Sequence, residues 1–263
     1  MDRDTRRQVG VVTAVVGGLA LGASGDYGSA TTSQSLVIPA DYAFGIWAPI
    51  YAGSLVHAAH QARPSRRADP LLRRTGWPAA AAYASVGTWV WLQDRPALQV
   101  PAIATSMGLA ALAYGRAQPA SAAEATSPVD RWTVRVPLGL FTGWVTLATA
   151  AGTTEALIAA GAGDLWPGRQ PWAVAVLGVA GAVAAVVTRR VPVSLAYPAA
   201  VVWGLVGTVA RSLPERPVPG IAAAVAAAAV LGAAVSARRA GWRRAGRRWT
   251  SSAPPGGRRV AGG

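Results

Sequence analysis

The chain has 263 residues, of which 52% are hydrophobic and only 14% are charged, and its formal net charge is +14. It contains no cysteine, which excludes thiol chemistry and cysteine-ligated metal sites. The charges gather in clusters between long runs of Ala, Val, Leu and Gly, which excludes an ordinary soluble domain and indicates a multi-pass membrane protein.

Eight apolar segments follow one another along the chain, and we expect each to cross the membrane as a helix. Their approximate ranges are 9–24, 42–60, 77–92, 99–115, 135–160, 172–188, 192–210 and 219–237. A helix that crosses the bilayer core normally needs ~20 residues, and the first and third segments are shorter. Each could be a tilted helix or a miscounted span. The first also resembles a signal peptide preceded by Arg6 and Arg7. Because cleavage would remove a helix that the bundle needs, we expect it to be retained.

The arginines test this count independently. All 25 basic residues are arginine, and an alternating eight-helix arrangement puts 21 of them on one side of the membrane. The four on the other side are Arg95, Arg169, Arg211 and Arg216. Because basic loops remain cytoplasmic, we expect an integral, multi-pass protein of a bacterial cell membrane with both termini in the cytoplasm. The net charge then follows from topology and requires no nucleic-acid partner.

Two aromatic stripes suggest a binding site. The stretch YAFGIWAPIY, residues 42–51, has aromatic side chains at steps of three and four, which share one helix face: Phe44, Trp47 and Tyr51. The fifth segment has a stripe with the same spacing, formed by Phe141, Trp144 and Ala148. Indoles inside the hydrocarbon need a partner or a polar cavity, so two interpretations remain, helix packing and the wall of a pocket for a flat ligand.

Two histidines inside the second segment raise the question of a metal or haem site. His57 and His60 are three residues apart, but His57 lies ten residues, or ~15 Å along a helix axis, from Trp47. Both also lie near an arginine cluster. We therefore expect them to pack at an interface and not to bind a metal.

One carboxylate, Glu155, lies in the fifth segment and returns to the helix face of Trp144. An ionisable group at membrane depth suggests a function, but Glu155 is near a helix end and is also explained as a solvated side chain. With Asp41 and Asp94 it would form an acidic rim at the outer mouth, where Arg95 is the only nearby counter-charge for an anionic ligand.

Three motifs together resemble the TspO/MBR family, which comprises the tryptophan-rich sensory proteins and the translocator protein. P-x-x-Y-A-F-G-I-W-x-x-x-Y, from Pro39 to Tyr51, is similar to the signature on that family's second helix. TWVWL (88–92) resembles its third-helix motif N-W-x-W. LFTGWVTLATAAG (140–152) resembles its fifth-helix motif P-Y-L-x-W-x-x-F-A-x-x-L-N. The motifs occur in the family's order, and the resemblance covers about residues 8–160.

The resemblance implies an all-α membrane protein, a TspO-like five-helix transmembrane bundle followed here by about three additional transmembrane helices. We accordingly divide the chain into a five-helix unit (1–161), three further helices (162–237) and a basic cytoplasmic tail (238–263). The tail is expected to be disordered or bound to the membrane surface. Residues 116–131 are expected to form a flexible linker.

Family members bind porphyrins and other tetrapyrroles, and some bind sterols, in a hydrophobic pocket. Carried over by motif, the resemblance implies a site formed by Phe44, Trp47, Tyr51, Thr88, Trp89, Trp91, Phe141, Trp144 and Ala148. Trp89 and Trp91 are about 200° apart around a helix, so both cannot point into one cavity. The family asparagines fall on Thr88 and Gly152, which reduces polar anchoring. Trp203, outside the five-helix unit, is expected to matter little.

We therefore expect a sensory or regulatory membrane protein that binds a porphyrin, a haem-like molecule or a similar flat hydrophobic ligand, with no resident cofactor or metal. Some family members are credited with weak porphyrin degradation, but the sequence has no independent catalytic constellation, so binding is favoured over catalysis. The alternative is a multi-span transporter for a small hydrophobic or cationic solute. Membrane lipids are the expected partners, with anionic lipid at the basic tail, and a homodimer is compatible with the sequence.

Overall fold

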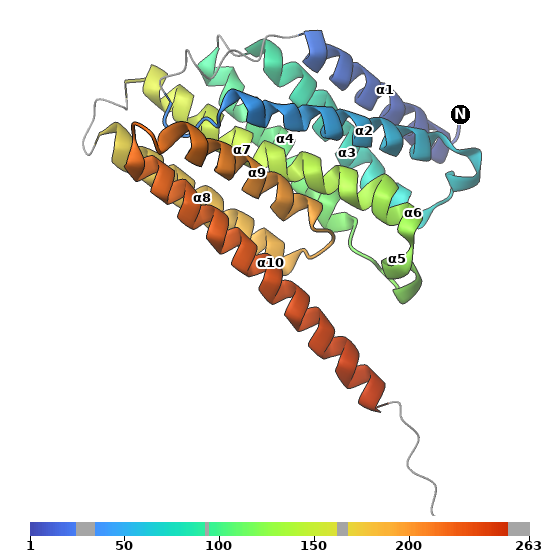
Figure 1. Cartoon of the computed structure of the whole chain (residues 1–263). Helices are drawn as coiled ribbons and strands as arrows, with labels where there is room; N and C mark the ends of the chain where they lie inside the picture. Colours follow the sequence, from blue (N-terminus) through green and yellow to red (C-terminus); the bar gives the residue numbers. More distant parts are fainter. Residues whose placement is uncertain (25–34, 93–94, 162–167, 252–263) are drawn as a thin grey trace, which may run out of the picture.

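The computed structural model describes residues 1–24, 35–92, 95–161 and 168–251, and its regular structure in these ranges is entirely helical (Figure 1). Eight of the described helices are long. They are α1 (Arg3–Ser24), α2 (Trp47–Ala62), α3 (Pro70–Trp89), α4 (Pro96–Arg116), α7 (Val136–Ala159), α8 (Arg169–Arg190), α9 (Ala196–Ser212) and α10 (Pro217–Ser251). Each corresponds to one of the eight apolar segments, so the expected all-α membrane bundle is confirmed.

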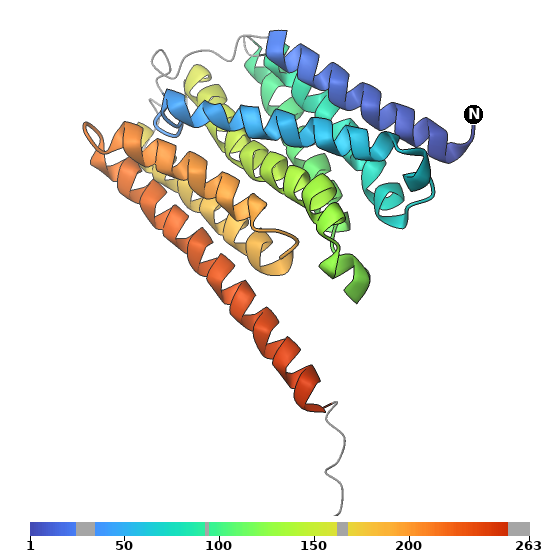
Figure 2. The same cartoon turned by 45° about the vertical axis from the view of Figure 1, so that its right-hand side comes forward.

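Five stretches are long and apolar enough to cross a membrane by length and composition alone. They are Arg3–Ser24, Leu98–Arg116, Pro128–Ile158, Arg169–Arg190 and Pro217–Ala240. Two of the other three long helices have fewer residues than a membrane crossing usually needs: α2 has 16 residues and α9 has 17. The 3-10 helix η1 (Asp41–Ile46) runs directly into α2, however, and extends this helical segment by a further six residues. Both short helices lie alongside the longer ones in the bundle (Figure 2).

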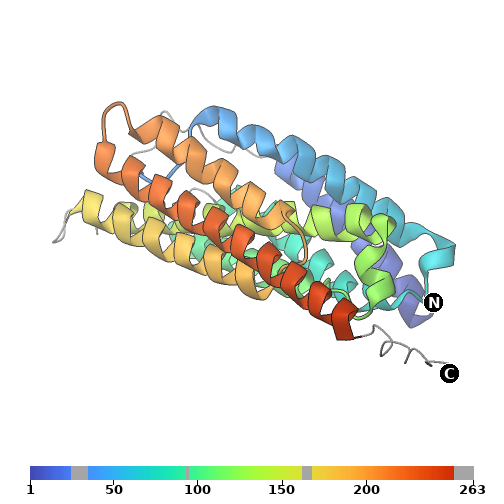
Figure 3. The ribbon, with the colours of Figure 1, turned by 60° about the horizontal axis from the view of Figure 1, so that its bottom comes forward.

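Neighbouring helices form a continuous series of contacts across the bundle. α3 packs between α1 and α4, α4 contacts α7, and α7 contacts α9. α10 packs against both α8 and α9, while α2 lies against α1 and α7. α1 begins and α10 ends at the same end of the bundle, as an even number of alternating crossings requires (Figure 3). We call this end the basic end, because the arginine clusters lie there, and the opposite one the far end.

Two helix boundaries differ from those expected. α3 begins at Pro70 because the Asp69 carboxylate accepts hydrogen bonds from the N–H groups of Leu71 and Leu72, at 2.8 and 3.2 Å. α10 continues to Ser251, so the basic tail is helical as far as that residue and projects beyond the other helices (Figure 1). The rest of the tail, 252–263, lies outside the described residues.

Arginines at the basic end hold the segment that was expected to be a flexible linker, residues 116–131. Arg74 of α3 donates hydrogen bonds to both carboxylate oxygens of Glu124, at 3.2 and 2.6 Å. Arg135 donates to the carbonyl oxygens of Ala117 and Glu124, at 3.0 and 2.7 Å. The segment also forms two short helices, α5 (Ala122–Thr126) and α6 (Pro128–Asp130). It is therefore fixed to the bundle rather than free.

The backbones of α1 and α3 come into direct contact at glycines. A Cβ atom on Gly18 would lie 2.3 Å from the carbonyl oxygen of Tyr83, and one on Gly87 would lie 2.7 Å from the Cα atom of Gly18. Lipid tails are as apolar as the interior of the bundle, so moving an apolar side chain from lipid into the bundle contributes little free energy. Close packing at small residues therefore holds the helices together. The α1–α3 contact therefore depends on these two residues having no side chain.

We predict that Gly18→Ala destabilises the protein by about 1–3 kcal/mol, because the added methyl group meets fixed backbone atoms. The neighbouring Gly17→Ala is the matched control, since a Cβ atom there has nothing within 4 Å. The control should be neutral or slightly more stable, because alanine favours a helix. Unfolding by SDS in mixed micelles measures both, and equal stability of the two variants would contradict the backbone contact.

A second prediction concerns the Glu124 carboxylate in the segment outside the spanning helices. The hydrogen bond from Arg74 is the main cause that lowers the pKa of Glu124 below its ordinary value of 4.5. A lowered pKa stabilises the fold at pH values above 4.5, and this contribution is lost as the pH falls through the lowered pKa. Glu124→Gln should therefore lower the free energy of unfolding by about 1 kcal/mol at pH 7 and leave it unchanged at a pH below the lowered pKa. The exposed Glu215→Gln is the control, and a pH-independent difference in melting temperature for Glu124→Gln would contradict this role.

Candidate ligand-binding site

The two aromatic stripes meet where α2 packs against α7. Phe44 in η1 and Trp47 at the start of α2 both contact the indole of Trp144 edge to face. The ring centroids are 5.6 Å apart for Phe44 and Trp144, and 6.2 Å apart for Trp47 and Trp144. Tyr51 contacts Trp47 at a centroid distance of 5.4 Å. We call these four residues the aromatic cluster. Spacing predicted that Phe44, Trp47 and Tyr51 share a face, and the structure places Trp144 of α7 against two of them.

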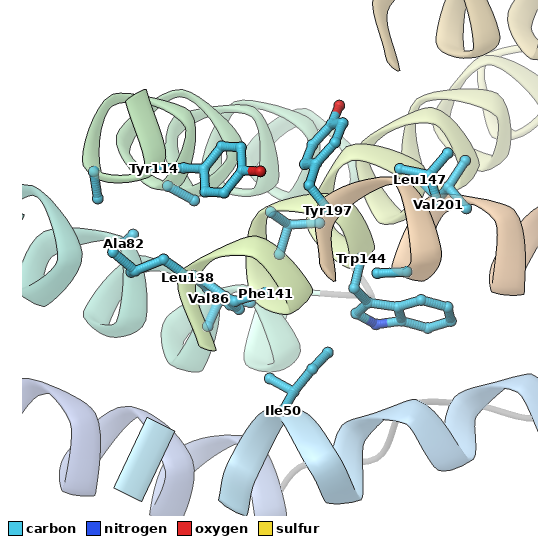
Figure 4. Packing of buried hydrophobic residues seen from close by; sticks show 14 of the residues in the cluster. Ile50, Ala82, Val86, Tyr114, Leu138, Phe141, Trp144, Leu147, Tyr197 and Val201 are labelled. Atoms are coloured by element: carbon cyan, nitrogen blue, oxygen red, sulfur yellow. The ribbon is translucent and has the colours of Figure 1, made fainter. Parts of the chain in front are cut away.

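The other two members of the second stripe face different neighbours. Phe141 stacks on Tyr83 of α3, with centroids 4.6 Å apart and planes inclined by 22°. Ala148 is partly buried and packs against the hydrophobic core. Figure 4 shows Phe141 and Trp144 on α7, with Ile50 of α2 pointing toward them. The α7 stripe thus contacts α3 at Phe141 and α2 at Trp144.

The third-helix residues point in different directions, and two of them lie away from the cluster. Trp89 is buried, with 9% of its surface exposed, and its indole N–H has no partner among the described residues. Trp91 is 56% exposed and donates its indole N–H to the carbonyl oxygen of Leu21, at 3.2 Å. Thr88 is exposed, and its hydroxyl donates to the carbonyl oxygen of Ala84. Of the three, only Trp89 therefore faces the interior.

A small cavity lies beside the aromatic cluster, between α1, α2 and α3. It is lined by Gly18, Leu19, Gly22, Ile50, Tyr51, Ser54, Tyr83 and Val86. The cavity has a volume of ≈ 10 Å³, which is enough for about one water molecule. Sequence reasoning missed its α1 and α3 residues; the available signal was the spacing of Gly18 and Gly22, which allows another helix to approach closely. A ligand larger than water would have to separate the surrounding side chains.

An arginine that we did not expect lies near two carboxylates of the expected acidic rim. At the far end, the charge of Arg211 of α9 interacts with those of both Asp41 and Glu155. Arg95 occupies the N-cap position of α4, and its side chain makes no capping hydrogen bond. Asp94 lies outside the described residues. The sequence missed Arg211 because nothing in it indicated that α9 would pack beside α7 and η1.

The two histidines lie inside the bundle near the basic end. His57 is 0% and His60 1% exposed. His57 donates its Nδ1–H to the carbonyl oxygen of Thr133, 3.0 Å away in the π-helix η4 (Arg131–Arg135). In the part of the chain that the structure describes, no group of three or more metal-ligating side chains forms. His57 therefore makes a contact between α2 and η4.

We expected Trp203 to lie far from the site, but the structure places it next to the first aromatic stripe. Its indole N–H donates to the carbonyl oxygen of Ala43, 2.8 Å away. Its ring also contacts Tyr42 edge to face, with centroids 5.9 Å apart. α9 therefore contacts the stretch that carries the first aromatic stripe, so Trp203 cannot serve as a distant control.

The all-helical bundle, its apolar helices and its aromatic cluster define an integral membrane protein of the TspO type. A family model described as TSPO-like protein matches residues 10–237. The chain belongs to this TSPO-like family. The match continues past residue 161, where we expected the TspO-like unit to end, and includes α8, α9 and most of α10. Neither the curated proteins nor the solved structures contain a significant match to the chain.

Proposed function

We propose that this TSPO-like membrane protein binds a flat hydrophobic molecule of the tetrapyrrole class at the aromatic cluster and acts as a sensory or regulatory protein. The observation that carries the proposal is the meeting of two aromatic stripes from α2 and α7 around Trp144. Large aromatic faces supply stacking area with little loss of side-chain entropy, which suits a flat conjugated ligand.

Binding requires the rings of the cluster to move apart. This movement breaks the contacts of Trp144 with Phe44 and Trp47, each worth about 0.5–1.5 kcal/mol beyond the apolar area that it buries. A flat ligand stacked between the separated rings would replace this contact area.

Recognition at this site depends mainly on aromatic area. The chain has no asparagine, and Thr88, on which one family asparagine falls, is exposed. The charges of Arg211, Asp41 and Glu155 at the far end already act on one another. We therefore expect the protein to accept several flat hydrophobic ligands with modest discrimination between them.

Trp144→Ala tests the proposal. It should weaken porphyrin binding by about 1–3 kcal/mol, because a buried stacking surface is lost. Ala148→Phe should weaken binding sterically, since Ala148 lies one turn further along α7. Binding is measured by quenching of intrinsic fluorescence in detergent or nanodiscs. Trp132→Ala is the matched control, because Trp132 is 61% exposed at the basic end. Wild-type affinity in both site variants would leave the cluster with a packing role only.

We also propose that the basic end faces the cytoplasm of a bacterial cell. The arginine asymmetry favours this orientation, because basic loops resist translocation. Reporter fusions after residues 70 and 122 and at the C-terminus should then give cytoplasmic signals, and fusions after residues 30 and 165 external ones. An external C-terminus would refute the orientation. With this orientation, the arginines of α10 beyond residue 237 lie on the side where anionic lipid is available. Electrostatic attraction to that lipid contributes about 1 kcal/mol of binding free energy for each arginine near the surface.

A further inference from the structure

α9 holds the segment that leads into α2. This segment, residues 35–46, runs beside α9, and the side chains of α9 bind its backbone. The hydroxyl of Thr208 donates to the carbonyl oxygen of Val37 at 3.1 Å. The indole N–H of Trp203 donates to the carbonyl oxygen of Ala43 at 2.8 Å. Val37 and Ala43 are 4% and 0% exposed, so these carbonyl groups belong to buried residues.

Gly207 brings the segment closest to α9. Its carbonyl oxygen accepts a hydrogen bond from the N–H of Ala40, at 3.1 Å. A Cβ atom on Gly207 would lie 2.7 Å from the Cβ atom of Ala43 and 2.8 Å from that of Pro39. Any side chain at this position therefore meets two residues of the segment, and the hydrogen bond to Ala40 forms only because glycine leaves the space open.

The same helix also supports the aromatic cluster. A Cβ atom on Gly204 would lie 3.2 Å from the indole of Trp144 and 2.5 Å from the side chain of Leu147. Trp144 thus contacts Gly204 of α9 as well as the rings of Phe44 and Trp47. One helix outside the five-helix unit therefore contacts both the central tryptophan and the segment in front of it.

We infer that α9 forms a wall of the ligand site, with Trp203, Gly207 and Thr208 as positioning residues that hold segment 35–46, and with it Phe44, against the rest of the aromatic cluster. Trp203 and Gly207 are four residues apart and share one face of α9, and Thr208 reaches the segment from beside that face. Carbonyl groups in apolar surroundings have no water to replace these hydrogen bonds, so separation from α9 is costly. That separation controls access to the cluster. The ligand part of the inference rests on the proposed function, whereas the contact itself does not.

Thiol labelling tests the contact without a ligand, because the chain contains no cysteine. Val37→Cys places a single small side chain at a position that is 4% exposed. In the full-length protein in nanodiscs, its reaction with a maleimide should be slow. Adding Gly207→Val should accelerate the reaction at least tenfold, because the valine displaces Ala43 and Pro39. Gly232→Val is the matched control, since a Cβ atom there has nothing within 4 Å, and it should leave the rate unchanged.

Trp203→Phe provides a milder version of the test that does not depend on the folding of the valine variant. It removes the indole N–H but keeps an aromatic ring, and should accelerate labelling of Val37→Cys about 2–10-fold, as expected for one lost hydrogen bond. Val206→Ala, at an exposed position of α9, is the control. Labelling rates within twofold of the parent in both Gly207→Val and Trp203→Phe would overturn the inference.

Porphyrin kinetics then separate a positioning role from general loss of structure. In Trp203→Phe, the association and dissociation rates should both rise by a similar factor, so that the Kd changes less than either rate. A lower melting temperature together with a Kd that rises as much as the dissociation rate would indicate mere destabilisation and would overturn the positioning role. If the wild-type protein binds no porphyrin, the proposed function fails, while the labelling result still decides whether α9 holds the segment.

Discussion

Direct contact between helix backbones at small residues is the constraint on which the rest of this bundle depends. Gly18 meets the backbone of Tyr83, and a Cβ atom on Gly143 would lie 2.4 Å from the carbonyl oxygen of Tyr197. Lipid offers apolar side chains nearly the same surroundings as the bundle interior, so helix pairs are selected by close packing rather than by burial alone. These contacts fix α3 against α1 and α9 against α7, and the larger side chains fill the space that remains between the pairs.

The aromatic cluster occupies one of these spaces. α7 is fixed against α9, and α2 also packs against α7. Where α2 and α7 face each other, Phe44, Trp47 and Trp144 fill the interval with edge-to-face contacts, which hold rings together without requiring parallel planes. Such contacts are individually weak, at about 0.5–1.5 kcal/mol each. The backbone contacts at glycines fix the helices, and the ring contacts fill the space between them.

Periodicity and charge in the sequence were sufficient for the local features. Steps of three and four predicted that Phe44, Trp47 and Tyr51 share a face, and the angle between Trp89 and Trp91 predicted that they diverge. Hydropathy predicted the eight helices, although the cap formed by Asp69 moved the start of α3. What the sequence did not reveal was which helices would be neighbours. Tyr83 lies near the site because α1 and α3 meet at Gly18, and Trp203 lies near it because α9 meets segment 35–46 at Gly207. Periodicity within one helix does not indicate which other helix will pack against it.

The hydrogen bond between Trp203 and Ala43 also has a consequence for biosynthesis. Its partners are 160 residues apart in the chain, with four further long helices between α2 and α9. At ordinary rates of translation, roughly 10–30 s separate the synthesis of segment 35–46 from that of α9. During this interval segment 35–46 and α2 have been synthesised, whereas α9 has not. The nascent protein therefore passes through a stage in which the carbonyl groups of Val37 and Ala43 lack the hydrogen bonds from Thr208 and Trp203.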